Sequence, residues 1–162
     1  MSSSRYTADH VRAASDKAFD EVTRAFESQL NGWEPDVLDA LASGGDVEAV
    51  KARMEAMVGP SGFLLFSRID HGALLRVAGQ SRKAVQYVVG NPLFALMMTR
   101  HDVRAALYAP LRVLIFEDEA GKTCVEYDTP SSQFGQFGDE RIAPTAAMLD
   151  KKLGTMVAMA IR

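Results

Sequence analysis

Histidine and cysteine supply most acid–base, nucleophilic and metal-binding chemistry, and this sequence contains few of them. His10, His71 and His101 lie far apart, and no two histidines have the H-x-x-x-H spacing of a metal pair. Cys124 is the single cysteine, and a lone thiol within an expected strand usually acts as a small hydrophobic side chain. We therefore expect no metal site, because folding alone would have to assemble it.

The densest polar cluster surrounds His101, after a segment with helical character. Asp102 follows it directly, and Arg104 comes two residues later. If residues 103–108 form a strand, Asp102 and Arg104 share one face of it. A histidine and an arginine at one cavity mouth can bind a carboxylate or a phosphate, and His101 can also act as an acid or base. The alternative is a polar turn in which Arg100 and His101 only complement the C-terminal dipole of a helix.

The element that must position this cluster is a passage from strand to helix at Gly90-Asn91-Pro92. Residues 84–89 carry the branched and aromatic side chains typical of a buried strand. Asn91 can cap the first helical turn, and Pro92 suits the next position because its missing N–H has no helical partner there. Such a helix start attracts anions or polar groups of a ligand. Asn91 and the nearby Tyr87 are therefore candidate binding residues, with an ordinary capped helix as the alternative.

A β-hairpin is expected directly beyond this helix. Residues 111–117 and 123–127 have strand character, and they flank an acidic, glycine-containing loop at 118–121. The first of these strands is apolar on both faces. We therefore expect it to be central in the sheet, or covered on both sides by a helix or a partner.

The phrases YVVGNP and PLRVLIFEDEAGK resemble DUF302, a family of small bacterial domains of unknown function. The resemblance covers roughly residues 63–130. It implies an α+β fold of β-α-β4-α order, similar to that of TATA-binding protein, with two long helices covering one antiparallel sheet. It also implies a homodimer and assigns no activity. Compared with the shorter family pattern, the chain carries a helical insertion at residues 33–58.

The two helices expected on the sheet come from opposite ends of the chain. A first strand is expected at residues 5–11, followed by a helix with Ser15 as its N-cap. Apolar residues recur at helical spacing up to Leu30, which predicts a face packed on the sheet. The second helix is expected from Ile142 to near the end of the chain. Before it, residues 131–138 are rich in glycine and polar side chains and predict a loop with two aromatic residues.

The insertion is expected to contain two short amphipathic helices. Residues 35–42 can form the first, with Val37, Leu38 and Leu41 directed inward. Asp46 can cap the second helix, which ends before Gly59-Pro60. The insertion could cover one end of the sheet, form a dimer surface, or simply pack on the sheet.

Length and composition are those of one globular domain, residues 1–162. The net charge of −3 and the pI near 5.6 argue against nucleic acid or an acidic membrane surface as the main partner. No apolar run is long enough to cross a bilayer, and the N-terminus lacks the apolar segment of a secretory signal. With a single cysteine, a cytoplasmic location is expected.

Most of the eight methionines fall on expected helices, where they can form an adaptable apolar lining. We therefore favour non-enzymatic binding of a small apolar or amphipathic ligand between sheet and helices, in a homodimer. The sequence does not identify a cofactor. One alternative is an enzyme that uses His101 as acid or base, and another is an interaction module that docks through residues 33–58. The candidate ligand-binding residues are Asn91, His101, Arg104, Tyr87 and His71.

Overall fold

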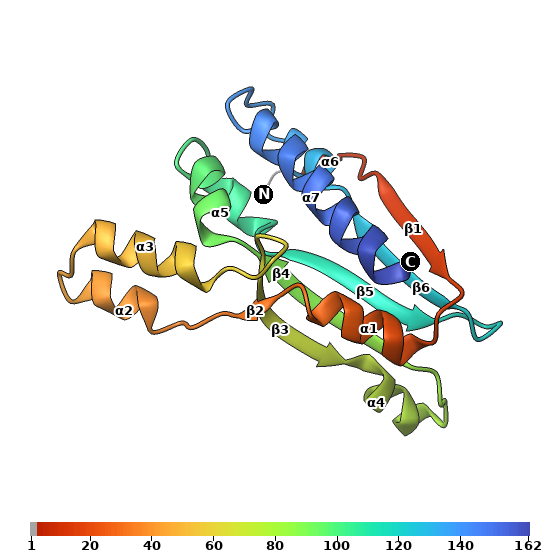
Figure 1. The fold of residues 1–162 in the computed structure, drawn as a ribbon. Coiled ribbons are helices and arrows are strands. Elements are labelled where there is room, and N and C mark those ends of the chain that lie inside the picture. Colours follow the sequence, from red (N-terminus) through yellow and green to blue (C-terminus); the bar gives the residue numbers. More distant parts are fainter. Residues whose placement is uncertain (1–2) are drawn as a thin grey trace.

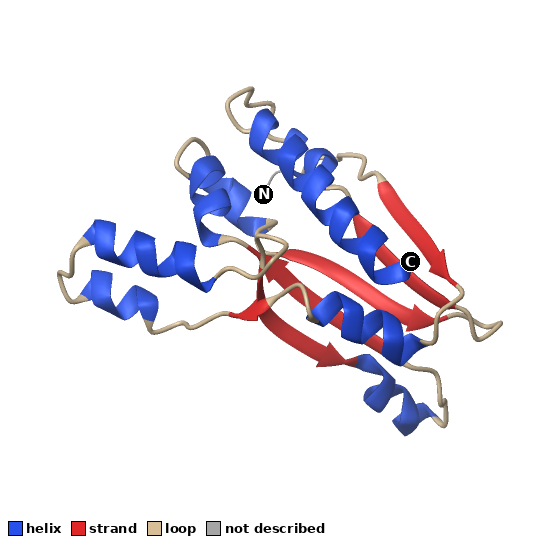
Figure 2. Cartoon of the chain, viewed as in Figure 1, coloured by secondary structure: helices blue, strands red, loops and turns tan. Residues whose placement is uncertain are grey.

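A computed structural model describes residues 3–162 and contains one six-stranded sheet with helices packed on one face (Figures 1 and 2). The strand order is β1-β6-β5-β4-β3-β2, and every neighbouring pair is antiparallel except β2 with β3. The α+β prediction is confirmed, as is the central position of β5. The strands are β1 (His10–Ser15), β2 (Asn31–Gly32), β3 (Leu64–Asp70), β4 (Ala84–Gly90), β5 (Leu111–Glu117) and β6 (Thr123–Asp128).

Helices α1 and α7 lie side by side over the sheet, and the α2–α3 hairpin projects beyond the end of the sheet near β2 (Figure 1). Among residues 3–162, no helix combines the length and the apolar character needed to cross a bilayer. The α-helices are α1 (Phe19–Glu27), α2 (Val37–Ala42), α3 (Val47–Met57), α4 (His71–Leu75), α5 (Pro92–Thr99), α6 (Pro130–Gly135) and α7 (Ala143–Ile161). Two 3-10 helices are η1 (Arg76–Ala78) and η2 (Val103–Leu107).

The main core fills the space between the sheet and helices α1 and α7. Alternate residues of the central strands, such as Tyr87 and Val113, are buried on this side together with Phe26 of α1 and Leu153 of α7. The Phe26 and Tyr87 rings lie 4.9 Å apart. This alternation follows from the period of two along a strand. Among residues 3–162, the opposite face of the sheet has no helical layer (Figure 2).

The strand-to-helix passage forms as the sequence predicts. β4 ends at Gly90, and the side-chain oxygen of Asn91 accepts hydrogen bonds from the N–H groups of Leu93 (2.9 Å) and Phe94 (3.4 Å). Pro92 occupies the first helical position of α5. The cap satisfies amides that would otherwise lack a partner, which explains the sharp turn from strand to helix.

The expected bounds at the N-terminus are wrong. β1 spans His10–Ser15 and not residues 5–11, because its partner β6 pairs from Thr123, opposite Ser15, to Asp128, opposite His10. Ser15 is consequently the end of a strand and not a helix cap. Its hydroxyl donates to the carbonyl of Ile161 at 2.8 Å and so ties β1 to the end of α7.

Three other local expectations also differ from the structure. Residues 103–107 form a 3-10 helix capped by Asp102, so the reading of this segment as a strand is wrong. The expected loop at 131–138 contains α6, whose Phe134 is buried. In α2 only Val37 is buried, because Leu38 and Leu41 face solvent on a helix that packs on its neighbours along a single narrow side.

Candidate functional site

Helix α5 is apolar around its whole circumference, with the sequence PLFALMMT. Such helices are usually buried on all sides. Here Met98 is buried, whereas Leu96 is 56% exposed and Met97 is 46% exposed. A concentrated apolar surface of this kind is where a binding site is expected.

A cleft of about 540 Å³ lies between α3 and the exposed side of α5, and we call it the α5 cleft. Its volume is within the range of roughly 300–1,000 Å³ found for small-molecule sites. Helix α5 contributes most of the apolar wall, and α3 with the following Val58 supplies the opposite wall. The lining residues are Lys51, Glu55, Val58, Asn91, Leu93, Phe94, Leu96, Met97 and Arg100.

A second cleft of about 370 Å³ lies on the other side of α5 and shares Asn91 and Leu96 with the first. Trp33 and Phe66 line it and stack with their ring centres 5.2 Å apart. The two clefts together leave much of α5 open to a ligand. The remaining lining residues are Leu38, Pro92, Ala95, Thr99, Ala109 and Pro110.

Two cationic side chains stand at the rim of the α5 cleft. Lys51 lies 3.9 Å from Glu48 in an exposed ion pair, which is weak in water. Arg100 donates from Nε to Nε2 of His101 at 3.2 Å and has no carboxylate within 4 Å among residues 3–162. Although Glu55 adds a negative charge, Lys51 and Arg100 leave the lining with a net positive charge suited to an anionic group.

Asn91 and His101 are the two candidate residues placed at or beside this cleft. Asn91 forms part of its wall, but both ends of its amide are already engaged, since Nδ2 donates to the carbonyl of Gly62 at 2.9 Å. His101 follows α5 and contacts Arg100, which lines the cleft. Asn91 therefore shapes the cleft, and His101 lies one residue beyond its lining.

Arg104 is directed elsewhere. Its guanidinium forms a double hydrogen bond with Asp102, with Nε at 3.0 Å from Oδ1 and Nη2 at 2.5 Å from Oδ2. This guanidinium keeps the pKa of the Asp102 carboxyl below its usual range. It also lies 5.1 Å from the centre of the Phe137 ring. Arg104 is consequently occupied by local partners.

Tyr87 is buried under α1, and its hydroxyl donates to Oε1 of Glu27 at 2.6 Å. Burial raises the pKa of Tyr87, and the Glu27 carboxylate beside it acts in the same direction. His71 begins α4 after the strand residue Asp70, which pairs with Val85 at the far end of β4 from Asn91. The five candidate residues are thus not gathered around one cavity.

The cleft depends on residues that the sequence analysis did not single out as site residues: Lys51, Leu96 and Arg100. The sequence does contain one signal for this cleft: the helical segment that follows Asn91-Pro92 has no polar face. In the part of the chain that the structure describes, no three histidine, cysteine or acidic side chains come together as a possible metal site.

Comparison with known proteins gives a match to a protein family, similarity to curated ion channels and similarity to a solved structure. The family described as domain of unknown function DUF302 matches residues 40–160. A curated fluoride-specific ion channel, FluC 1 of Brucella suis, is 29% identical over 86 residues, which is 52% of this chain and 32% of the channel protein. FluC 1 of Brucella abortus is also 29% identical, with 30% of its length covered. The chain thus spans about a third of the length of these relatives.

The fold also has a solved counterpart. The crystal structure of an uncharacterized conserved DUF302 protein from Bacillus stearothermophilus superimposes with a TM-score of 0.66 over 94% of this chain and 98% of that chain. Its sequence identity of 17% makes this a likeness of fold alone. Together with the family match over residues 40–160, it confirms the resemblance drawn from the YVVGNP and PLRVLIFEDEAGK phrases. The chain belongs to the DUF302 family.

Proposed function

We propose that this protein binds a small amphipathic molecule in the α5 cleft and is not an enzyme. The single observation that carries the proposal is a cleft of about 540 Å³ whose apolar wall is the uncovered side of α5. An apolar lining with a few polar groups is typical of small-molecule sites. The expected position between sheet and helices is replaced by one between helices, because core side chains fill the sheet–helix boundary.

The charges at the rim define the chemical class of the ligand. Lys51 and Arg100 stand at the edge of an apolar wall formed by Leu93, Leu96 and Met97. A ligand with an apolar body and one anionic group would place the first against α5 and the second near Arg100. An arginine without a carboxylate partner favours such an anion.

Anilinonaphthalene sulfonate tests this proposal, because it joins aromatic rings to one anionic group and fluoresces when shielded from water. Leu96→Asp puts a carboxylate into the apolar wall, and we expect it to weaken binding by about tenfold or more. Val77→Asp is the matched control, because Val77 lies on η1 and is 90% exposed. Equal binding by Leu96→Asp and the unaltered protein would contradict the proposal.

The charge component has its own test. Arg100→Gln should weaken binding of the same dye by about three- to tenfold while leaving its apolar contacts intact. Raising the salt concentration should reduce the difference between the two proteins, since exposed charges are screened. An unchanged affinity of Arg100→Gln for the dye would contradict the proposal that the ligand carries an anionic group.

Homodimer formation is a second part of the proposal. It is supported by three exposed apolar side chains on the α2–α3 hairpin, Leu38, Leu41 and Val47. Val37, Val50 and Met54 form a small core inside the hairpin, so replacements on its outside should leave it folded. Light scattering should give the mass of a dimer, and Leu38→Asp with Leu41→Asp should give that of a monomer. A dimer unaffected by these changes would exclude the hairpin as the contact.

A further inference from the structure

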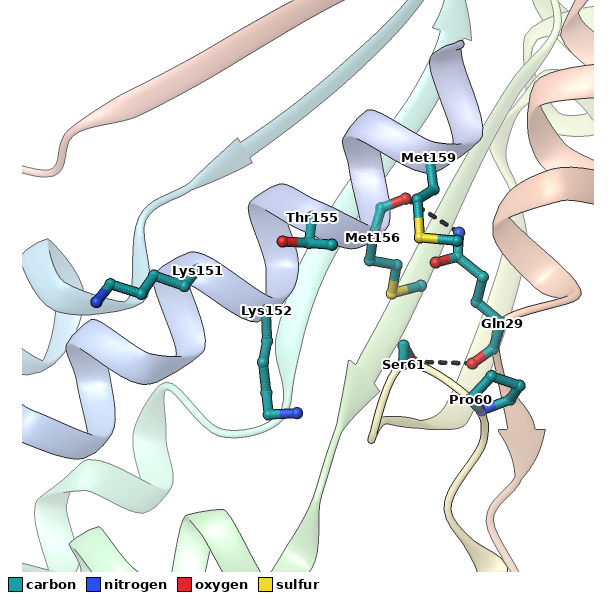
Figure 3. A pocket seen from close by; sticks show the side chains of 8 residues that line it. All are labelled: Gln29, Pro60, Ser61, Lys151, Lys152, Thr155, Met156 and Met159. Atoms are coloured by element: carbon teal, nitrogen blue, oxygen red, sulfur yellow. Dashed lines mark hydrogen bonds between the residues drawn. The ribbon is translucent and has the colours of Figure 1, made fainter.

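A separate cleft of about 270 Å³ lies between α7 and the loop at residues 59–62, and we call it the α7 cleft (Figure 3). It shares no lining residue with the α5 cleft. Two lysines, a threonine and two methionines come from one helix, and the opposite wall comes from the end of α1 and the loop. The lining residues are Gln29, Pro60, Ser61, Lys151, Lys152, Thr155, Met156 and Met159.

The wall opposite α7 is fixed by hydrogen bonds within the protein. The amide of Gln29 donates to the carbonyl of Met156 at 3.0 Å and to that of Ala25 at 3.1 Å. The hydroxyl of Ser61 donates to the carbonyl of Gln29 at 2.8 Å (Figure 3). It also accepts from the N–H of Phe63. These polar groups are used by the fold, so recognition of a ligand falls to the α7 side chains.

Lys152 is the lysine of the α7 cleft whose ammonium is held against other parts of the fold. Within residues 3–162 neither its ammonium nor that of Lys151 has a carboxylate within 4 Å, since the lysines that form ion pairs there are Lys51, Lys83 and Lys122. The Lys152 ammonium lies 5.6 Å from the centre of the Phe94 ring and close to the backbone of Gly62. These contacts hold a half-buried cation in place without neutralising it.

Thr155 and the methionines complete the environment of this cation. Thr155 comes three residues after Lys152, on the same side of the helix, and is an exposed residue. Met156 forms a buried floor and Met159 is 61% exposed at the edge, with Pro60 across from them. Figure 3 shows Lys151 extending away from Met156 and Lys152 extending towards the loop. Lys152, Thr155 and Met156 thus line one cleft of about 270 Å³.

We propose that the α7 cleft binds a small anion that carries a short apolar chain, either a carboxylate or a phosphate monoester. The oxygens of the anion accept from the Lys152 ammonium and the Thr155 hydroxyl, and the chain lies on Met156 and Met159. Both halves of the ligand are matched by side chains of α7, because ammonium and hydroxyl donors recognise oxyanions and methionine accommodates varied apolar shapes. This site is independent of the one proposed at α5.

The methyl groups of methionine report on each cleft separately. Protein labelled with carbon-13 at the methionine methyls should be titrated with hexanoate, hexyl phosphate and hexanol. We expect both anions to shift the resonances of Met156 and Met159, and hexanol to bind about tenfold more weakly or worse. The anion that binds more tightly shows whether the headgroup is a carboxylate or a phosphate monoester. If only Met97 responds, the α5 cleft is the site and the α7 proposal fails.

Matched lysine variants test the role of Lys152. Lys152→Gln should weaken binding of the anions about tenfold. Lys122→Gln makes the same change in charge at an exposed position that lines neither cleft, and it should alter binding less than about twofold. Equal effects of the two variants would mean general attraction to a basic surface and would overturn the site. Thr155→Val, at an exposed position, should weaken binding about threefold and leave the fold intact. An unchanged affinity in both Lys152→Gln and Thr155→Val would also overturn it.

Discussion

The side-chain amide of Asn91 donates a 2.9 Å hydrogen bond to the carbonyl of Gly62, while its oxygen caps α5. One residue thereby fixes the start of α5 and the loop that enters β3. Val58, before this loop, lines the α5 cleft, and Pro60 within it lines the α7 cleft. The position of both clefts therefore depends on a side chain that first drew attention as a ligand contact.

Replacement of Asn91 should reduce stability in a graded way. Asn91→Ala removes the cap and the bond to Gly62, and we expect a loss of about 1–3 kcal/mol in the free energy of unfolding. Asn91→Ser keeps a good N-cap but is too short to bond to both partners, so its loss should be smaller. Urea denaturation measures both values. Equal stability of Asn91→Ala and the unaltered protein would contradict this role.

Tyr87 should contribute to stability and not to ligand binding. Tyr87→Phe removes the hydrogen bond to Glu27, which keeps its contact with Arg68 at 3.1 Å and remains partly hydrated. We expect a loss of about 1 kcal/mol and unchanged affinity for anilinonaphthalene sulfonate. Weaker dye binding without a loss of stability would place Tyr87 in the binding site after all.

His10 should make stability depend on pH at the edge of the sheet. Its ring lies 2.8 Å from Asp128 and 3.4 Å from Glu126, and these carboxylates raise the pKa of His10 above its usual value of about 6.5. A raised pKa means that the stabilisation is complete below about pH 6.5 and is lost as the pH rises through the folded-state value. Comparing the stability of His10→Gln with the unaltered protein across this range measures the effect.

The partner of His10 supplies a control for that experiment. Asp128→Asn removes the carboxylate whose hydrogen bond contributes most to the raised pKa of His10. An NMR titration should therefore show the pKa of His10 closer to its usual value. The ion pair is exposed, and its contribution to stability should be small. A His10 pKa at or below about 6.5 in the unaltered protein would contradict the geometry.

Gly62 should resist substitution because of its left-handed backbone and because Lys152 lies close to it. Gly44 shares the backbone conformation but has no such neighbour, so it separates the two effects. Gly62 has φ of +83°, and a Cβ placed there would lie 3.0 Å from Nζ of Lys152. Gly44 has φ of +80° with no neighbour within 4 Å of such a Cβ. Both changes to alanine should cost about 1 kcal/mol for the left-handed backbone. Gly62→Ala should additionally weaken binding of hexanoate in the α7 cleft, whereas Gly44→Ala should not.

Local chemistry explains which parts of the fold could be predicted from the sequence. The helix start at Asn91-Pro92 and the hairpin loop at 118–121 are each determined by neighbouring residues in the sequence. Both are present as expected. The start of β1 was misplaced because the alternation of side chains continues through residues 5–11. Only pairing with β6, more than one hundred residues away, determines where this ladder begins.

The candidate sites were less predictable because they depend on which side chains the packed helices leave exposed. Leu96 and Met97 resemble core residues in the sequence, and their exposure results from the way α3 and α5 approach each other. Lys152 resembles any surface lysine until Phe94 and Gly62 are placed beside it. No local spacing encodes contacts between residues so far apart in the chain.

The most direct test of binding at α5 is a titration with anilinonaphthalene sulfonate followed through the methionine methyl resonances. Our account predicts that Met97 shifts most, that its shift saturates with the fluorescence, and that Leu96→Asp weakens both responses in parallel, by about tenfold or more in affinity. Saturable binding of the dye with an unmoved Met97 resonance would contradict it.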